Sequence, residues 1–304
     1  MPKVSIIIPT YNREEFIKGT IDSVLNQTYK DFEIIVVDDG STDNTKSYLE
    51  KYNSKIKLIE QKNSERAVAR NNGVKHSSGE YIAFVDSDDI WKEDKLKIQV
   101  EVLDNYKDVI LTYGTCLRIN KNGKTIKPAK RQREGYSGNV FDKLLLRNFV
   151  VSATPVLRHA IFNQTKGFKT KYVPYEDWEF WIRLSKLGKF YFIKDPLAFY
   201  RLHETQSVQL VKAEKIEEVT TALLLDSFNL QPISNALKNK SLGIANLRFC
   251  YWYLLANKPE IAKEKLDYAI KLNPGFALDP RWYGLNLTCR FTGLKNLLNL
   301  ESLH

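Results

Sequence analysis

The sequence is poor in the features that mark secreted, disulfide-bonded and membrane-spanning proteins. Its three cysteines, Cys116, Cys250 and Cys289, are far apart and form no Cys-x-x-Cys pair, so neither a disulfide framework nor a zinc site is expected. No window approaches the ~18 uninterrupted apolar residues that cross a bilayer. The first residues also lack the long apolar stretch of a signal peptide. We therefore expect a cytoplasmic protein.

Two glycine-based nucleotide motifs are also missing. None of the 14 glycines is spaced Gly-x-Gly, which excludes the dinucleotide-binding fingerprint. Gly123-Lys124-Thr125 has the form of the end of a P-loop, but Arg118 stands where the first glycine of that loop belongs. The flanking residues indicate a hairpin instead, so neither motif explains the sequence.

Positive charge is in excess, with 46 Lys and Arg against 36 Asp and Glu and a formal net charge of +10. This excess favours anionic partners, such as nucleic acid, nucleotide phosphates or an acidic membrane surface, and does not choose among them. Hydrophobic residues make up 43% of the 304 residues. That is enough for the core of one large α/β domain or of two smaller ones.

The first hundred residues alternate between strand-like apolar runs and stretches with helical spacing. Because the runs are almost entirely apolar, we expect strands that are buried on both faces, in a mainly parallel sheet with helices on both sides. This is an α/β fold of Rossmann-like character. The predicted strands cover residues 4–8, 32–37, 56–60 and 81–85, and the clearest helices cover 13–26 and 65–76.

After about residue 108 the pattern changes. An Asn122-Gly123 turn between the runs 109–119 and 124–127 predicts a β-hairpin. Residues 118–133 contain Lys and Arg but no acidic residue. This basic run is typical of a solvated hairpin, and a role in guiding an anionic acceptor or membrane surface is the alternative. Further helices are predicted near 140–147 and 175–187, with a strand at 190–193, and residues from about 206 form a separate helical region.

Polar segments follow three of the predicted strands, where ligands bind in open α/β sheets. They are Pro9-Thr10-Tyr11-Asn12, Asp38-Asp39-Gly40-Ser41 and Asp86-Ser87-Asp88-Asp89. In an extended segment Asp86 and Asp88 would project to the same side and form a hard-oxygen site for Mg²⁺ or Mn²⁺. Asp and Ser are also ordinary turn and cap residues, but three such segments at one edge favour a functional site.

The sequence resembles glycosyltransferase family 2 in six motifs that occur in that family's order between residues 5 and 178. The resemblance implies a GT-A fold and inverting transfer of a sugar from a nucleotide diphosphate sugar, usually a UDP-sugar, with Mn²⁺ or Mg²⁺. The acceptor would be a hydroxyl of a glycan or of a lipid-linked glycan in cell-surface polysaccharide or glycoconjugate synthesis. The motifs are Ser5-Ile6-Ile7-Ile8-Pro9-Thr10-Tyr11-Asn12, Ile35-Val36-Val37-Asp38-Asp39-Gly40-Ser41-Thr42-Asp43, Ala69-Arg70-Asn71, Phe84-Val85-Asp86-Ser87-Asp88-Asp89, Gly167-Phe168 and Glu176-Asp177-Trp178.

The resemblance assigns roles at the donor by position. Tyr11 would stack on the uracil, Asp39 would accept a hydrogen bond from the base, and Arg70 would assist the nucleotide half of the site. Asp88 would hold the metal against the pyrophosphate. The full set expected at the nucleotide sugar is Pro9, Thr10, Tyr11, Asp39, Arg70, Asp86 and Ser87, and the set expected at the metal is Asp88, Asp86 and His203.

At the acceptor, Asp177 resembles the family's catalytic base. It would sit at the start of a helix, whose positive end favours the ionised carboxylate; capping of that helix is the alternative role. Glu176 is expected to contact the acceptor or a loop, and Trp178 to be either a sugar platform or part of the core. His203, in a segment that many members carry after the last strand, has either the metal role or a structural one. Glu65 departs from the family, which often has glycine there.

The last hundred residues suggest less. Tyr253, Ala262, Leu266, Ala269 and Pro274 match part of one tetratricopeptide repeat, and a single helix pair of this kind is expected to pack on the catalytic domain. The apolar tail after Phe276 suits either packing within the fold or peripheral contact with the inner face of the cytoplasmic membrane. We divide the chain into a catalytic domain, 1–205, with a nucleotide-sugar half (1–108) and an acceptor and base half (109–205), and a helical region, 206–304.

Two other functions have some support in the sequence. A nucleotidyltransferase would use the same sheet edge, but Pro9-Thr10-Tyr11-Asn12 replaces the glycine- and lysine-rich loop that it needs. A nucleic-acid binder would use the charge of +10, or the chain would be a non-catalytic scaffold. Aromatic residues are not interleaved with the basic run, so we expect no nucleic-acid partner.

Overall fold

The computed structural model describes residues 1–126, 135–204 and 211–279. The chain forms two compact units. The first contains residues 1–141, 148–170 and 176–204, and the second contains 142–147, 171–175 and the residues from 205 onward. The division of the first unit into a donor half and an acceptor half stays a prediction.

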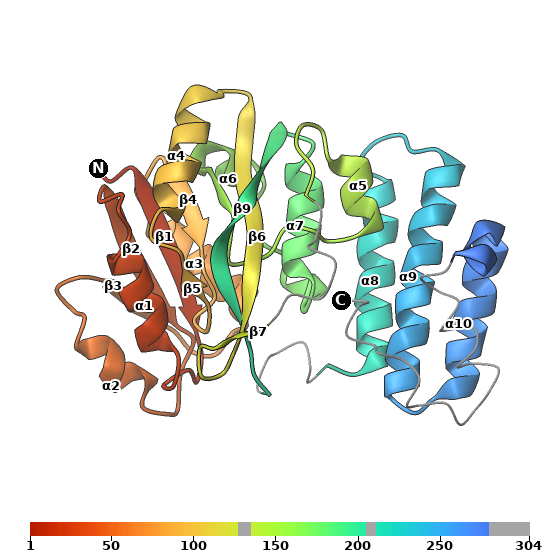
Figure 1. Ribbon diagram of the computed structural model, residues 1–304, viewed down its shortest axis with the longest axis horizontal. Helices are drawn as coiled ribbons and strands as arrows, with labels where there is room; N and C mark the ends of the chain where they lie inside the picture. Colours follow the sequence, from red (N-terminus) through yellow and green to blue (C-terminus); the bar gives the residue numbers. More distant parts are fainter. Residues whose placement is uncertain (127–134, 205–210, 280–304) are drawn as a thin grey trace. The chain divides into compact units, whose positions relative to one another are not determined.

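The first unit is built on a nine-stranded mixed sheet (Figure 1). Its strands are β1 Val4–Thr10, β2 Phe32–Asp38, β3 Lys57–Glu60, β4 Tyr81–Phe84, β5 Ile90–Trp91, β6 Val109–Asn120, β7 Thr125–Ile126, β8 Val156–Arg158 and β9 Lys189–Leu202. They are ordered β3-β2-β1-β4-β8-β6-β9-β5, and β7 pairs with β6. The pairs among β1, β2, β3 and β4 are parallel, as is β6 with β9. β8 runs antiparallel to β4 and β6, and β5 runs antiparallel to β9.

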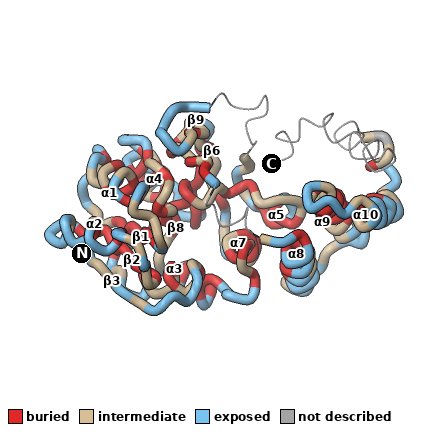
Figure 2. Tube along the Cα trace, turned by 90° about the horizontal axis from the view of Figure 1, so that it is seen from below, coloured by how far each residue is buried: buried red, intermediate tan, exposed pale blue. Residues whose placement is uncertain are grey.

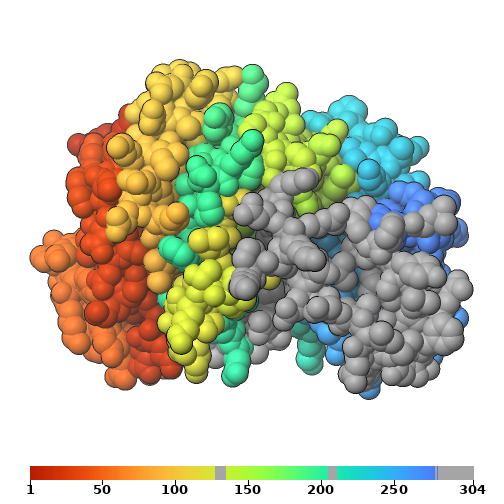
Figure 3. All heavy atoms as spheres, viewed as in Figure 1, coloured from red at the N-terminus to blue at the C-terminus, as the bar shows by residue number. Residues whose placement is uncertain are grey.

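Helices cover both faces of this sheet. They are α1 Ile17–Leu25, α2 Thr45–Glu50, α3 Arg66–Lys75, α4 Lys95–Asn105, α6 His159–Gln164 and α7 Glu176–Leu184. Figure 2 shows buried strands between α1 and α4 on one side and α3 on the other. In Figure 3 the atoms of α1 and α2 (red to orange) and of α4 (amber) form a continuous surface on the near side.

The apolar character of β1 follows from this layering. Every residue of the strand is buried. Ile6 and Ile8 belong to the same core cluster as Ile21 of α1 and Leu96 of α4, whereas Ile7 meets α3 at Gly73. Because successive side chains of a strand point to opposite faces, a strand with helices on both sides needs an unbroken apolar run.

The second unit is helical in its described part. It contains α8 Ala213–Phe228, α9 Asn235–Leu255, α10 Pro259–Leu272 and the 3₁₀ helix η3 Pro274–Leu278, together with most of the helix α5 Phe141–Leu146. Ala262, Leu266 and Ala269 form the buried face of α10. Gly243 of α9 lets the ring of Phe276 approach so closely that an added Cβ would lie 2.5 Å from it. The tetratricopeptide character of this helix pair stays a prediction.

The fold class predicted from the sequence is confirmed, and several individual elements differ from the expectation. The strand predicted at 190–193 is longer than expected: β9 extends to Leu202, and His203 follows it directly. The helices α4 and α6 and the two-residue strand β5 were not predicted; in α4, lysines and a glutamate interrupt the apolar spacing.

The predicted hairpin forms by pairing of β6 with β7, and Gly123 in its turn has a φ of +79°. Residues 127–134, which contain the rest of the basic run, and the apolar tail from residue 280 lie outside the described residues. Within the described ranges, no helix combines the length and apolar character that crossing a membrane requires.

Two helix glycines provide a matched test of this packing. A Cβ on Gly73 would lie 2.4 Å from Ile7 Cγ2 and 3.2 Å from Val37 Cγ2, whereas the nearest atom to a Cβ on Gly19 would be 4.0 Å away. We expect Gly73→Ala to destabilise the protein by about 1–3 kcal/mol through overpacking. Gly19→Ala should be neutral or stabilise it by up to about 1 kcal/mol. Urea unfolding measures both, and equal effects would contradict this packing.

Candidate active site

The carboxyl ends of β1, β2 and β4 meet at one edge of the sheet. Thr10 pairs with Asp38 in the register of β1 and β2, and Ile7 pairs with Phe84 in that of β1 and β4. The three polar segments that follow these strands are therefore neighbours, as predicted.

Hydrogen bonds join the loops after β1 and β2. The amide of Asn12 donates to Ser41 Oγ (3.0 Å), and the amide of Thr42 donates to Asn12 Oδ1 (2.8 Å). Asp38 Oδ1 accepts from the amide and the hydroxyl of Ser41. Gly40 has a φ of +78°, a conformation that favours glycine. The two loops thus form one rigid structure at the sheet edge.

The residues expected to bind a base lie on this structure. The ring of Tyr11 is exposed, with 41% of its surface accessible, and Pro9, Thr10 and Asp39 are buried. Among the described residues, Thr10 Oγ1 has no hydrogen-bond partner. Asp39 Oδ1 accepts from Gln61 Nε2 (2.7 Å) and from the amide of Ser64 (2.9 Å). An exposed aromatic ring therefore lies on the loop beside a buried carboxylate that is held through one oxygen.

Asp86 to Asp89 form a turn, closed by the amide of Asp89 donating to the carbonyl of Asp86 at 3.1 Å. The extended conformation expected for this segment is therefore wrong, and residue alternation does not determine where Asp86 and Asp88 point. Ser87, within the turn, is buried.

Asp88 is held by two cationic or potentially cationic groups. Its Oδ2 lies 2.9 Å from His203 Nε2 and 3.4 Å from Arg13 Nε. Burial alone would raise the pKa of Asp88, but the hydrogen bond with His203 and the charge of Arg13 outweigh it and lower that pKa. Asp88 and His203 are thus neighbours, as the metal prediction requires. Arg13 was not predicted at the site, although it directly follows the motif that ends at Asn12.

The next carboxylate, Asp89, is structural. Burial, together with the charges of Asp88 and Asp86, raises its pKa well above the usual value. Its Oδ1 accepts from the amide of Arg201 (3.0 Å), and Arg201 Nε donates to the carbonyl of Asp88 (2.8 Å). Arg201 therefore ties β9 to the turn that carries Asp86 and Asp88. A role for Arg201 was not predicted from the sequence.

The side chains of Asp86, Asp88 and His203 could supply some of the ligands of a divalent cation. Two carboxylates and an imidazole are acceptable ligands for Mn²⁺ and, through the oxygens, for Mg²⁺. Across the described ranges, no three His, Cys, Asp or Glu side chains are grouped closely enough to hold a metal ion by themselves. This agrees with the usual Mg²⁺ arrangement, in which one or two carboxylates share the ion with substrate phosphates.

Arg70 joins the turn after β4 to the start of α7. Its Nη2 lies 2.6 Å from Asp86 Oδ1 and its Nη1 lies 2.7 Å from Glu176 Oε1, and Arg66 Nε also lies 2.7 Å from Glu176 Oε1. Burial would lower the pKa of Arg70, but the carboxylates of Asp86 and Glu176 outweigh it and raise that pKa. Glu176 is buried and faces these two arginines. Its expected contact with the acceptor or a loop stays a prediction.

Asp177 and Trp178 follow Glu176 in the first turn of α7. Trp178 is buried, whereas Asp177 remains partly exposed. Ser152 Oγ (2.9 Å) and Asn148 Nδ2 (3.2 Å) donate to Asp177 Oδ2. The predicted helix start is confirmed, but the pKa of Asp177 is raised rather than lowered. Burial and the charge of Glu176 outweigh Arg70, Arg66 and the hydroxyl of Ser152.

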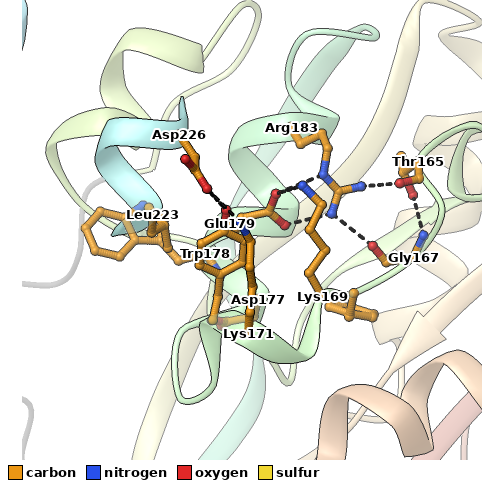
Figure 4. Close-up of polar contacts among 12 residues, drawn as sticks. Thr165, Gly167, Lys169, Lys171, Asp177, Trp178, Glu179, Arg183, Leu223 and Asp226 are labelled. Atoms are coloured by element: carbon orange, nitrogen blue, oxygen red, sulfur yellow. Dashed lines mark hydrogen bonds and ion pairs between the residues drawn. The ribbon is translucent and has the colours of Figure 1, made fainter. Parts of the chain in front are cut away.

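Ion pairs anchor α7 to the loop that precedes it (Figure 4). Glu179 accepts from Lys169 Nζ (2.9 Å) and from Arg183 Nη2 (2.7 Å). Arg183 also donates to the carbonyl oxygens of Gly167 (2.9 Å) and Thr165. Asp177 and the arginine-bound Glu176 are thereby carried on a fixed helix.

Asn71 explains why two of the sequence motifs occur together. Its amide group donates to the carbonyl of Phe168 and accepts from the amide of Phe168, both at 2.8 Å. Gly167 has a φ of +74°, and a Cβ there would lie 2.4 Å from Asn71 Oδ1. Only glycine fits this close approach.

Glu65 stands where the family often has glycine, and its backbone shows the reason for that preference. Its φ is +78° with ψ at 151°, a region that residues other than glycine adopt at a cost. The residue immediately precedes α3, which carries Arg66 and Arg70. The replacement of the family's usual glycine by Glu65 therefore lies at a strained backbone position beside the site.

Comparison with known proteins gives consistent matches. The family model for glycosyl transferase family 2 matches residues 5–165. WfgD of Escherichia coli, a UDP-Glc:α-D-GlcNAc-diphosphoundecaprenol β-1,3-glucosyltransferase, is 38% identical over 188 residues, which are 60% of this chain and 70% of WfgD. Uncharacterized glycosyltransferases of Rickettsia bellii, Rickettsia felis and Rickettsia conorii are 37–41% identical over 47–60% of this chain. The matched part spans about a quarter of their length, 24–26%.

Solved structures share the fold at low sequence identity. The S. aureus protein TarS (residues 1–349), in complex with UDP, has a TM-score of 0.64 at 20% identity, and the match covers 91% of each chain. The mannosyltransferase PcManGT from Pyrobaculum calidifontis, in complex with GDP-Man and Mn²⁺, has a TM-score of 0.61 at 19% identity. That match covers 95% of this chain and 84% of PcManGT.

The contribution of the buried ion pairs to stability is tested by making the same change, Glu to Gln, at a buried and at an exposed position. Glu176→Gln removes a charge that is 1% exposed and faces two arginines, whereas Glu80→Gln removes a charge that is 51% exposed and pairs with Lys3. We expect a loss of about 3 kcal/mol of unfolding free energy for Glu176→Gln, because Arg66 and Arg70 lose their shared partner. Glu80→Gln should cost less than about 1 kcal/mol. Similar urea midpoints for the two variants would refute the buried ion pairs.

Proposed function

Because the chain belongs to glycosyltransferase family 2, we propose that it transfers a sugar from a nucleotide diphosphate sugar to an acceptor hydroxyl with inversion. The observation that carries this proposal is the ion-paired Arg70, which connects Asp86, in the turn after β4, with Glu176, beside Asp177. A donor-binding turn and a candidate base are thus fixed to one another within the first unit.

We propose a uridine nucleotide as the donor carrier. Asp39 uses Oδ1 for Gln61 and Ser64, and its Oδ2 is the acceptor for the N3–H group of uracil. The exposed ring of Tyr11 stacks on the base, with Pro9 and Thr10 behind it. This assignment is supported by the names of two similar proteins: WfgD uses UDP-Glc, and TarS was crystallised with UDP.

Asp88, with Asp86 and His203, would hold Mn²⁺ or Mg²⁺, which when bound neutralises charge on the departing diphosphate. Arg13 adds positive charge at the same carboxylate, and Ser87 lies in the turn between the two aspartates. PcManGT supports this assignment, since its complex contains Mn²⁺.

Asp177 is the proposed base. In a single displacement the acceptor oxygen attacks the anomeric carbon from the face opposite the diphosphate, and a carboxylate takes the hydroxyl proton. Burial and Glu176 raise the pKa of Asp177, which makes its ionised form a stronger base. Because Trp178 is buried, we assign it to the core rather than to a sugar platform.

We propose a lipid-linked glycan as the acceptor and the inner face of the cytoplasmic membrane as the place of reaction. The support is the acceptor in the name of WfgD, a diphosphoundecaprenol carrying GlcNAc. Residues 1–108 would bind the donor, and residues 109–205 would supply the base. The helical region would be an accessory to this reaction.

The metal assignment is tested by calorimetry of UDP binding with and without Mn²⁺. We expect Mn²⁺ to tighten binding of UDP to the wild type and Asp88→Asn to abolish that gain. Asp108→Asn is the control, because Asp108 is exposed and pairs with Lys189 away from the proposed ligands. Metal-independent binding of UDP that is equal in all three proteins would refute the metal role of Asp88.

Base selectivity is tested at Asp39. In Asp39→Asn the amide oxygen can keep the hydrogen bonds from Gln61 and Ser64, which places the NH₂ donor where Oδ2 was. A donor there opposes N3–H of uracil but matches N3 of cytosine, which is an acceptor. We expect UDP to bind at least about tenfold more weakly, since a hydrogen bond to a charged group is lost, and CDP to bind no more weakly. Parallel losses for UDP and CDP would contradict the assignment.

A further inference from the structure

The segment between α5 and β8 runs past Asp177 and is held firmly within the first unit. Phe149 is buried, and its ring packs on that of Tyr113 with centroids 5.6 Å apart. The carbonyl of Ala153 accepts from Trp91 Nε1 at 2.8 Å, and the carbonyl of Thr154 accepts from Gln99 Nε2 at 2.9 Å. A segment fixed at several points is a precise support for a polar side chain.

Two side chains of this segment hold Asp177. Ser152 Oγ and Asn148 Nδ2 both donate to Asp177 Oδ2, at 2.9 and 3.2 Å. The amide group of Asn148 is itself oriented, because its Oδ1 accepts from the amide of Val150 at 3.2 Å. Neither residue belongs to the motifs that relate the chain to its family.

The two carboxylate oxygens of Asp177 accept different numbers of hydrogen bonds. An ionised carboxylate has about four positions that accept hydrogen bonds, two on each oxygen. Asn148 and Ser152 take both positions on Oδ2, and the amide of Trp178 takes one on Oδ1 at 2.6 Å. Among the described residues, none takes the second position on Oδ1, and Asp177 is partly exposed.

We propose that Asn148 and Ser152 are positioning residues that hold the Asp177 carboxylate through Oδ2 and reserve Oδ1 to receive the acceptor proton. The inference rests on the proposed function, in which Asp177 is the base. As the acceptor oxygen bonds to the anomeric carbon, its proton passes to Oδ1 and the bond from that carbon to the diphosphate oxygen breaks. The diphosphate leaves with the electron pair.

The charged groups around Asp177 determine in which direction its pKa should change when a contact is removed. Glu176 precedes it on α7, and Arg70 and Arg66 face it from α3. Glu176 and burial favour the protonated carboxyl, whereas the two arginines and the hydroxyl of Ser152 favour the ionised form. Removal of the hydroxyl therefore raises the pKa of Asp177 further.

The positioning contact is measured without any substrate, by following the ¹³C signal of the Asp177 side-chain carboxyl against pH in aspartate-labelled full-length protein. Asp177→Asn assigns the signal. We expect a higher pKa of Asp177 in Ser152→Ala than in the wild type, and no change in Ser47→Ala. Ser47 is the matched control, because its hydroxyl donates to the carbonyl of Asn44 on the exposed surface of α2. An unchanged or lowered pKa in Ser152→Ala would overturn the inference.

The catalytic consequence is measured as release of UDP from UDP-glucose with an α-GlcNAc diphosphate lipid as acceptor. In Ser152→Ala we expect kcat to fall roughly tenfold, part of the contribution of a general base, and the acid limb of the pH profile to move to higher pH. Affinity for UDP should stay unchanged. A profile and kcat equal to those of Ser47→Ala, with Asp177→Asn inactive, would overturn the catalytic part. Full activity of Asp177→Asn would instead refute the proposed base and leave the carboxyl titration to decide the positioning contact.

Discussion

The guanidinium group of Arg70 is buried between two carboxylates from distant parts of the sequence, Asp86 and Glu176. A buried charge without partners is strongly unfavourable, so the turn after β4 and the start of α7 must both be in place around it. Arg66 adds a second cation from the same helix. The position of Asp177 beside Glu176, and of Asp88 beside Asp86, therefore follows from one set of ion pairs carried by α3.

The sheet places the remaining residues of the candidate site. Parallel pairing brings the ends of β1, β2 and β4 to one edge. Hydrogen bonds of Asn12 with Ser41 and Thr42 join two of the resulting loops into a single surface. Tyr11 and Asp39 lie there, with Asp88 on the neighbouring turn and His203 directly after β9. In the proposed reaction, recognition of the nucleotide, neutralisation of its diphosphate and removal of the acceptor proton fall to separate groups of the first unit.

Much of the fold and of the candidate site was predictable from the sequence. The features that were not predictable depend on contacts that form only in the folded chain. Continuous apolar runs indicate buried parallel strands, and the motif residues indicate the edge where they end. The pairing of Arg70 with Glu176 was not predictable, because it joins residues that only the folded chain brings together. The helix-end argument gave the wrong sign for the pKa of Asp177, since burial and an adjacent carboxylate outweigh the helix terminus. Ser152 and Asn148 lie in no motif, so only their contacts reveal them.

We propose a single displacement in which a base on α7 activates the acceptor opposite the departing diphosphate. The most direct test is the anomeric configuration of the product formed from a UDP-α-sugar, read from its ¹H NMR coupling. We expect a β-linked product. An α-linked product would contradict it, because retention of configuration requires a different course of reaction from one attack assisted by Asp177.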